Sequence, residues 1–423
     1  MSLLNGMAAV KEEIIKCMKC GNCQAACPIY KELRLEPAVA RGKIHLAGML
    51  AGGELKAAPA LAERFALCLT CLACTAVCPS GVKVCDIILA ARAALAAELG
   101  LPFAKRAAFA ALTQPKLFRA GLKTFARLQG LAFRRLAPFK MKPRFPLGLE
   151  MRRVVPPLAT ASFLDRAKEK YPVEKPLARV ALFAGCLNNY VYPRVGHAAL
   201  HVLQANRVEV VIPREQHCCG APSIYNGATG MAREMARSHV DIFGSLGVDA
   251  VITMCGTCGE SFAHFYPRLL EDVPGYGKKA RELARKTTDI ARFLYRLPLD
   301  KGNLRSLDLS VTYHQPCHLG RGLGVVKEPV ELLSGIPGTR YTPLKDPARC
   351  CGNAGSFSLS HYHLSYRILG HKLKDIAGTG AQVVATGCPA CKMQLTDGLT
   401  QENMSQEAMH TVEILAHAYG FAL

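Results

Sequence analysis

The feature that most constrains the fold of this 423-residue chain is a set of five cysteines that occurs twice. The first set is Cys186, Cys218, Cys219, Cys255 and Cys258, and the second is Cys317, Cys350, Cys351, Cys388 and Cys391. Corresponding members lie 131 to 133 residues apart, and an offset this constant is typical of an internal duplication. Two copies of one folding unit are therefore expected.

Each group of cysteines follows a short apolar segment with the length of a buried strand. The first unit contains "RVALFAGC", "VEVVIPREQHCC" and "VDAVITMCGTC", and the second contains "SVTYHQPC", "RYTPLKDPARCC" and "AQVVATGCPAC". We expect these strands to run out to the cysteines. Helical segments near 194–205 and 230–246 separate the strands of the first unit, which predicts a parallel sheet. Ligands of such sheets bind beyond the carboxyl ends of the strands, so each set should converge on one site.

The adjacent cysteines, Cys218–Cys219 and Cys350–Cys351, are unsuited to simple disulfides. Neighbouring Cα atoms are about 3.8 Å apart, whereas disulfides usually span roughly 4.4–6.8 Å. We therefore expect the paired thiolates to bridge two metals of one cluster, with the following glycine allowing a close backbone turn. Five thiolates exceed the four positions of zinc, although zinc in one copy and buried structural cysteines stay open as alternatives.

A second cysteine pattern lies near the N-terminus. "CMKCGNCQAACP" and "CLTCLACTAVCP" both follow C-x2-C-x2-C-x3-C-P, the spacing of two-cluster ferredoxins, in which the fourth cysteine serves the other cluster. Cys17, Cys20, Cys23 and Cys78 are thus assigned to one [4Fe–4S] cubane, and Cys68, Cys71, Cys74 and Cys27 to the other. Two zinc sites or redox thiols are a much weaker interpretation. The intervening residues 31–66 have a helical composition.

Charge is concentrated in one segment. The formal net charge is +21, and residues 101–160 supply +12 of it, from 13 Lys or Arg and the single acid Glu150. Basic and apolar residues recur there at roughly helical spacing, which predicts either a surface for an anionic membrane or acidic partner, or an amphipathic helix pair packed on the cluster domains. A nucleic-acid partner is not expected. Because no signal peptide or long apolar run is present, we predict a cytoplasmic protein, with peripheral attachment to the inner face of the cell membrane left open.

With these motifs, the chain resembles the iron–sulfur subunits of glycolate oxidase and of flavin-linked lactate dehydrogenases. It is also similar to the related cysteine-rich subunits of heterodisulfide reductase and of anaerobic glycerol-3-phosphate dehydrogenase. "CLTCLACTAVCPSGV" and the connector around 111–120 are most similar to the glycolate and lactate branch. The resemblance implies that a complete set of five cysteines holds a non-cubane [4Fe–4S] cluster. Some glycolate oxidase subunits lack a cysteine of the last pair, whereas this chain keeps Cys388 and Cys391, which leaves the branch open.

The predicted fold class is α+β and multidomain. It comprises a mostly helical ferredoxin-type domain at 1–100, a helical basic connector at 101–176, and CCG domains with parallel sheets at 177–305 and 306–423. Outside the motifs, we expect Cys85 to be a buried thiol. His217, His314 and His318 flank cluster cysteines and are expected to tune clusters by hydrogen bonding, or to pack. Arg41 and Lys43 are expected either near the ferredoxin clusters or on a solvated helix face.

Neither a flavin nor a nicotinamide motif is recognisable, since "GRGLG" at 320–324 and "GYGKK" at 275–279 are incomplete. A chain with up to four clusters and no two-electron cofactor is expected to relay electrons from an FAD-containing dehydrogenase subunit for a 2-hydroxyacid towards quinone or another carrier. In the alternative, the CCG clusters themselves reduce a disulfide or react with quinone. An electron store without a dedicated partner is a third, weaker hypothesis.

Overall fold

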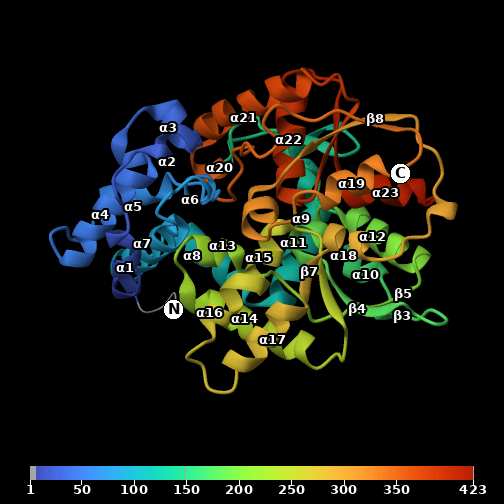
Figure 1. Cartoon of the computed structure of the whole chain (residues 1–423), viewed down its shortest axis with the longest axis horizontal. Helices are drawn as coiled ribbons and strands as arrows, with labels where there is room; N and C mark the ends of the chain where they lie inside the picture. Colours follow the sequence, from blue (N-terminus) through green and yellow to red (C-terminus); the bar gives the residue numbers. More distant parts are fainter. Residues whose placement is uncertain (1–5, 147, 423) are drawn as a thin grey trace.

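The computed structural model describes residues 6–146 and 148–422. In Figure 1, the N-terminal helices (blue) form a lobe of their own beside two larger α/β regions, one green to yellow and one orange to red. The teal connector runs between them. None of the helices in the described ranges has both the length and the apolarity needed to cross a membrane.

The N-terminal region is mostly helical, as the sequence predicts. Its elements are η1 (Gly6–Val10), α1 (Lys11–Ile15), α2 (Asn22–Ala26), α3 (Pro28–Leu33), η2 (Glu36–Ala38), α4 (Ala40–Gly52), α5 (Pro59–Ala66), α6 (Ala73–Ala76) and α7 (Val84–Leu99). Pro28 and Pro59 occupy first helical positions, where their missing N–H costs no hydrogen bond. Ile44, Phe65 and Ile87 are buried in the core between α4, α5 and α7, which supports the cysteine loops.

The two long helices of the connector lie in its first half. Helices α8 (Phe103–Leu112) and α9 (Pro115–Ala132) are followed by an antiparallel hairpin of β1 (Phe133–Ala137) and β2 (Lys140–Pro143), and later by α10 (Phe163–Arg166). The prediction of a helical connector to about residue 176 is therefore wrong beyond Ala132. Pro138 and Pro143 disfavour a continued helix, and the Phe133 ring packs edge-on against Phe125 at 6.3 Å.

The first α/β region contains β3 (Lys170–Tyr171), β4 (Ala178–Phe183), β5 (Val208–Val211), β6 (Ala250–Thr253) and β7 (Thr287–Asp289), in the sheet order β3-β5-β4-β6-β7. All pairs are parallel except β3 with β5. The accompanying helices are α11 (Gly185–Tyr190), α12 (Pro193–Ala205), α13 (Ala221–Tyr225), α14 (Thr229–Gly244), α15 (Gly256–Glu260), η3 (Ser261–Phe265), α16 (Tyr266–Leu269), α17 (Gly277–Lys286) and α18 (Ile290–Arg296).

The second region repeats this topology. Its sheet has the order β11-β10-β8-β9 and is parallel throughout, with β8 (Leu309–His314), β9 (Thr339–Tyr341), β10 (Val383–Thr386) and β11 (Glu407–His410). Its other elements are η4 (Lys301–Asn303), η5 (His318–Gly322), α19 (Glu328–Ser334), α20 (Phe357–Ser360), α21 (Tyr362–Ala377), α22 (Pro389–Gln401) and α23 (Thr411–Ala418). The order β9-β8-β10-β11 matches β5-β4-β6-β7, so the duplication predicted from the cysteines holds for the fold.

One strand prediction is wrong in both copies. Strand β5 ends at Val211 and β9 ends at Tyr341, so loops rather than strands carry the adjacent cysteines. Pro213 and Pro343 follow within two residues of these ends, and proline has no N–H to continue a ladder. The two regions pack directly on each other, because α12 lies against α23 and the His410 ring contacts the Met254 carbonyl at 3.0 Å.

Candidate metal centre

Both cysteine sets open into a single cavity of about 880 Å³. Its walls include all ten cysteines of the two sets, together with Cys68 and Cys71 from the N-terminal region. The Sγ atoms of Cys255 and Cys388 are 3.8 Å apart, so the two sets meet across the interface of the α/β regions. The sequence predicts one site per unit, whereas the fold joins the two sites into a shared chamber.

Within the chamber the thiols form a nearly continuous series. In each set the adjacent pair lies close to the first and to the last cysteine, the last cysteine lies close to the fourth, and the two sets join at Cys255 and Cys388. Hydrogen bonds and burial among these sulfurs raise the pKa of Cys218 and Cys258 well above the ordinary value. Several buried thiolates cannot coexist here without a cation, and iron–sulfur clusters supply that positive charge together with one-electron chemistry. The donor set therefore fits clusters.

The glycine after each adjacent pair has the backbone conformation that the sequence predicts. Gly220 has φ +79° and Gly352 has φ +84°, both in the left-handed region that favours glycine. The surroundings differ, however. A Cβ on Gly352 would lie 2.5 Å from the Ser365 carbonyl oxygen, whereas a Cβ on Gly220 would make ordinary van der Waals contacts, with the Met235 side chain at 3.5 Å and the Ala232 Cα at 3.7 Å.

This difference yields a matched prediction. Both G220A and G352A should cost about 1–2 kcal/mol for the backbone conformation, but G352A must also displace the α21 backbone next to Cys351. We expect G352A to lower the thermal midpoint and the iron content of the purified protein more than G220A does. Equal losses in the two variants would contradict this.

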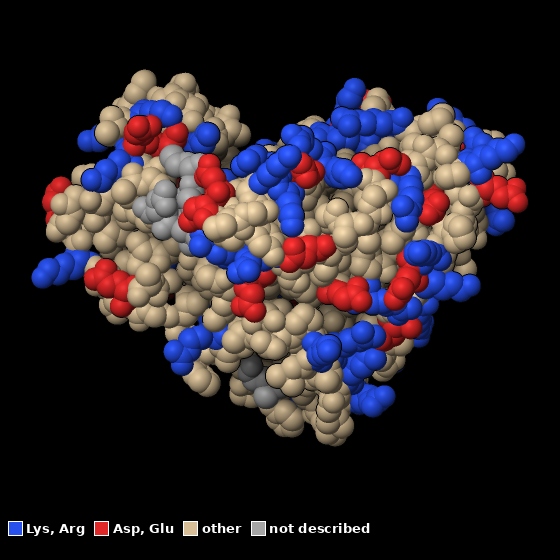
Figure 2. Space-filling model, turned by 90° about the horizontal axis from the view of Figure 1, so that it is seen from below, with Lys and Arg blue, Asp and Glu red and all other residues tan. Residues whose placement is uncertain are grey.

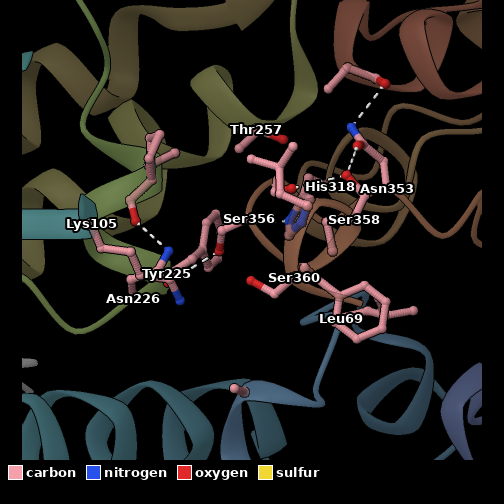
Figure 3. A pocket seen from close by; sticks show the side chains of 18 of the residues that line it. Leu69, Lys105, Tyr225, Asn226, Thr257, His318, Asn353, Ser356, Ser358 and Ser360 are labelled. Atoms are coloured by element: carbon pink, nitrogen blue, oxygen red, sulfur yellow. Dashed lines mark hydrogen bonds between the residues drawn. The ribbon is translucent and has the colours of Figure 1, made fainter. Parts of the chain in front are cut away.

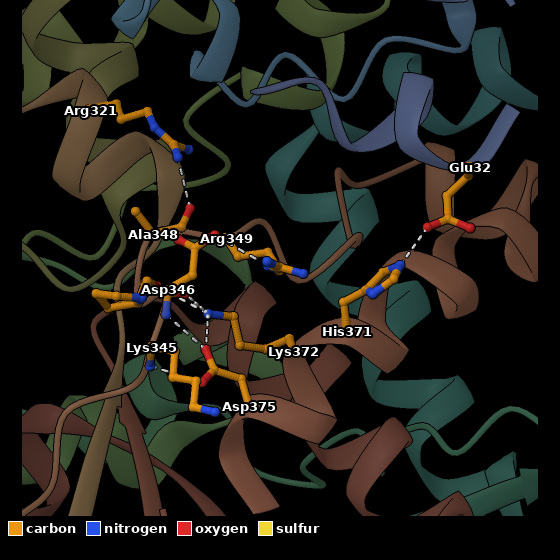
Figure 4. Close-up of polar contacts among 10 residues, drawn as sticks. Glu32, Arg321, Lys345, Asp346, Ala348, Arg349, His371, Lys372 and Asp375 are labelled. Atoms are coloured by element: carbon orange, nitrogen blue, oxygen red, sulfur yellow. Dashed lines mark hydrogen bonds and ion pairs between the residues drawn. The ribbon is translucent and has the colours of Figure 1, made fainter. Parts of the chain in front are cut away.

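Cys71 connects the N-terminal region to the second cysteine set. Its thiol lies close to Cys317 and Cys350, and the hydrogen bond with Cys317 together with burial raises the pKa of Cys71 well above the ordinary value. Arg321 holds this junction, because its guanidinium donates to the Cys71 carbonyl at 3.1 Å, to the Cys317 sulfur at 3.7 Å and to the Ala348 carbonyl at 2.9 Å. Figure 4 shows Arg321 reaching Ala348 on the loop that leads to Cys350.

The same interface is fastened at its edge by ion pairs. Glu32 of α3 contacts Arg367 of α21 at 3.0 Å. It also contacts His371 of the same helix at 2.7 Å, as Figure 4 shows. Behind them the buried Lys372 donates to the Asp346 carbonyl at a short distance. The loop carrying Cys350 and Cys351 is thus fixed from both sides, which keeps the second set against Cys71.

The predicted cubane cysteines are partly brought together. Cys27, Cys68, Cys71 and Cys74 line one small cavity, in agreement with the crossed pairing expected for the second cubane, and burial raises the pKa of Cys74 to about 12. Of the cysteines predicted for the first cubane, Cys17 lies close enough to Cys23 to interact with it electrostatically, and Cys20 is exposed. The Cys78 sulfur accepts a hydrogen bond from the Val82 N–H at 3.4 Å. Assignment of individual ligands stays a prediction.

Lys43 and Cys85 also line the small cavity that contains Cys27, Cys68, Cys71 and Cys74. Lys43 is 1% exposed and donates to the Ala38 carbonyl, so a solvated helix face does not explain it, and burial lowers its pKa. Arg41 instead reaches the Glu36 carboxylate at 2.7 Å and the Lys19 carbonyl at 3.1 Å. Burial raises the pKa of Cys85 well above the ordinary value.

A hydrogen-bonded polar group lies beside the chamber, and of its three members only His318 stands out in the sequence. The Tyr225 hydroxyl donates to Glu260 at 2.6 Å, and the same carboxylate oxygen is 2.5 Å from His318 Nδ1. Burial disfavours the charged His318 ring, but the charge and hydrogen bond of Glu260 outweigh it and raise the His318 pKa. Figure 3 shows Tyr225 and His318 directed into the same space.

The duplication does not repeat this polar group. The corresponding residues of the other copy are Phe357, Met393 and Leu187, which have no ionisable side chain. A position-by-position comparison of the two copies would have revealed Tyr225 and Glu260, since both differ in polarity from their counterparts. The duplicated scaffold therefore carries the hydrogen-bonded Tyr225, Glu260 and His318 at positions whose counterparts are apolar.

The comparisons with known proteins agree with these observations. A cysteine-rich CCG domain model matches residues 180–263 and 311–396, and a 4Fe-4S dicluster domain model matches 13–82. A probable glycolate oxidase iron-sulfur subunit of Bacillus subtilis is 30% identical over 96% of this chain and 94% of its own length. The chain belongs to this family. It therefore carries several [4Fe–4S] clusters and acts as an iron–sulfur electron-transfer subunit.

Other relatives cover part of the chain. Lactate utilization protein A of Halalkalibacterium halodurans is 30% identical over 56% of this chain and 97% of its own. One component of the fumarate reductase (CoM/CoB) of Methanothermobacter marburgensis is 32% identical over 58% of this chain and 47% of its own. Among solved structures, a hypothetical protein from Helicobacter pylori covers 98% of this chain and 73% of its own, with TM-score 0.53 and 10% identity, which shows a shared fold.

Proposed function

We propose that this family member transfers electrons between an FAD-containing 2-hydroxyacid dehydrogenase subunit, of glycolate or lactate type, and quinone or another carrier. The observation that carries the proposal is the series of thiols that begins at Cys71 and continues through both CCG sets inside one chamber. Adjacent one-electron centres suit a relay, and substrate oxidation then belongs to the flavin of a separate subunit.

The experiment is an anoxic purification of the full chain from its native host, followed by identification of whatever co-elutes. A flavin-containing dehydrogenase subunit whose substrate reduces the clusters of this chain is expected. Complete turnover from hydroxyacid to quinone by the isolated chain would contradict the proposal, because the chain would then need its own two-electron cofactor.

The chamber favours a second candidate function. Its volume of about 880 Å³ lies in the range of small-molecule sites, roughly 300–1,000 Å³. Lys105, Asn226 and Ser356 form a hydrogen-bonded polar group in its wall, with Lys105 Nζ and Ser356 Oγ both 3.1 Å from Asn226 Oδ1 (Figure 3). In this alternative the CCG clusters themselves reduce a disulfide or a quinone bound in the chamber. Co-elution of a haem-bearing membrane subunit without flavin would favour it.

We further propose that the connector docks on an anionic membrane. The inner side of helix α9 carries the buried Ala126, and Lys123 one turn away pairs with Asp165 at 2.9 Å. Its outward face carries Leu117, Leu128 and Leu131, which are 69%, 52% and 72% exposed. Acidic side chains are interspersed with basic ones on the face shown in Figure 2, whereas residues 101–160 contain one acid. Exposed leucines flanked by cations are typical of interfacial helices.

Vesicle binding tests the connector. Burying one leucine contributes about 1.5–3 kcal/mol, so the double variant L128S/L131S should bind vesicles that contain anionic lipid at least about tenfold more weakly. Leu177, which is 41% exposed outside the helix, provides a matched control in L177S. Equal binding by both variants, or binding that does not depend on anionic lipid, would contradict membrane docking.

A further inference from the structure

The two CCG regions differ at one position beside their cysteines. Phe183 ends β4 three residues before Cys186, and His314 ends β8 three residues before Cys317. The Phe183 ring packs in an aromatic cluster, with ring centroids 4.7 Å from Phe262 and 5.9 Å from Phe243. A buried apolar ring in the first copy is thus replaced by an imidazole in the second.

The imidazole of His314 is fully buried and its nitrogens lack ordinary partners. The residue is 0% exposed, and among the described residues neither Nδ1 nor Nε2 has a hydrogen-bond partner. One ring nitrogen and the sulfurs of Cys351 and Cys391 all lie within 4.8 Å of one another. A buried imidazole whose nitrogens make no hydrogen bond is unfavourable. We therefore expect a partner for the His314 ring in the space between it and the two sulfurs.

A metal is the partner that fits. Imidazole nitrogen and thiolate sulfur bind zinc or iron at about 2.0–2.3 Å, and ligands of one such metal lie roughly 3.5–4 Å apart. The three ligand atoms, all within 4.8 Å of one another, therefore lie close enough to bind one ion with at most small side-chain movements. The buried Lys372, whose charge acts on Cys351, does not serve as the partner of His314, because it donates to the Asp346 and Pro347 carbonyls.

We propose that His314 supplies a nitrogen ligand to the metal bound by Cys351 and Cys391. The inference rests on the proposed function only in taking the second CCG set to be a metal centre. It makes the two centres chemically different, with thiolate ligands in the first and a mixed nitrogen and sulfur set in the second. The second set keeps all five cysteines, so His314 is a neutral ligand in addition to them rather than a replacement for one. The second centre, which lies against Cys71, would then differ from the first in ligand set and in reduction potential.

The test uses the complete protein, purified anoxically after labelling with ¹⁵N-histidine. Pulsed electron–nuclear double resonance on the reduced protein should show a nitrogen coupling of the size found for directly bound imidazole. The H314F variant introduces the residue that the first copy uses, and should lose this coupling and change one reduction potential. His217 provides the control: its ring nitrogens already contact Ser238 Oγ at 2.9 Å and the Cys218 carbonyl at 3.2 Å, so H217F should keep the coupling.

Metal analysis separates the two metals that could accept this ligand. One zinc per chain that is lost in H314F and kept in H217F would equally assign His314 as a ligand, with zinc as the metal. A spectrum of the unmutated protein with only weak, hydrogen-bond-sized nitrogen couplings, together with no zinc, would overturn the assignment even if H314F failed to fold. Absence of a flavin partner would overturn the proposed function but leave the bound-nitrogen signal unaffected.

Discussion

Replacement of Cys71 by alanine should remove one [4Fe–4S] cluster and interrupt electron transfer to the second CCG set. Cys71 shares a small cavity with Cys27, Cys68 and Cys74, and its thiol also reaches Cys317 and Cys350. We expect a loss of about four iron atoms per chain and a fall of at least about 100-fold in the rate at which the CCG centres are reduced. Iron analysis and rapid-freeze electron paramagnetic resonance measure the two effects.

Cys85 provides the matched control for this substitution. It lines the same small cavity as Cys71 but belongs to neither repeated motif. C85A should keep the full iron content and the rate of cluster reduction. If C85A lost as much iron as C71A, the assignment of cubane ligands from the repeated spacing would be wrong.

Replacement of Arg92 by methionine should strongly destabilise the junction between the N-terminal and first CCG regions. The Arg92 side chain is partly buried in the wall of the chamber, where the loss of solvation lowers its pKa, and its guanidinium donates to main-chain carbonyls on both sides of the junction. These are the carbonyls of Phe65 at 2.8 Å, Cys68 at 2.6 Å and Tyr225 at 2.8 Å. Leaving several buried acceptors unsatisfied should cost about 3–5 kcal/mol.

Thermal unfolding and limited proteolysis of the holoprotein measure this effect, and R92K should recover part of the loss because it keeps the charge with fewer donors. An exposed arginine serves for comparison. Arg340 pairs with Asp308 at 2.7 Å with both side chains mostly exposed, so R340M should change stability by less than about 1 kcal/mol. A similar thermal midpoint for R92M and R340M would show that the carbonyls find other donors.

Local patterns in the chain were sufficient to predict the duplicated architecture and the chemistry of the site. The constant offset between the cysteine sets, the apolar segments before each group and the repeated ferredoxin spacing each specify the element in which a residue lies. This is why the two parallel sheets and the mostly helical N-terminal region could be predicted. Strand ends were less predictable, because Pro213 and Pro343 ended β5 and β9 before the cysteines.

How these parts meet was settled by packing between elements that are distant in the chain. Such packing brings Cys255 to face Cys388 across a shared chamber, places Cys71 within reach of Cys317, and buries His314 beside Cys351. The outward direction of the α9 leucines is likewise set by the ion pairs of its inner face with Asp165. Residue spacing reports which face of one helix or strand is apolar, but it carries no information about which distant surface that face will contact.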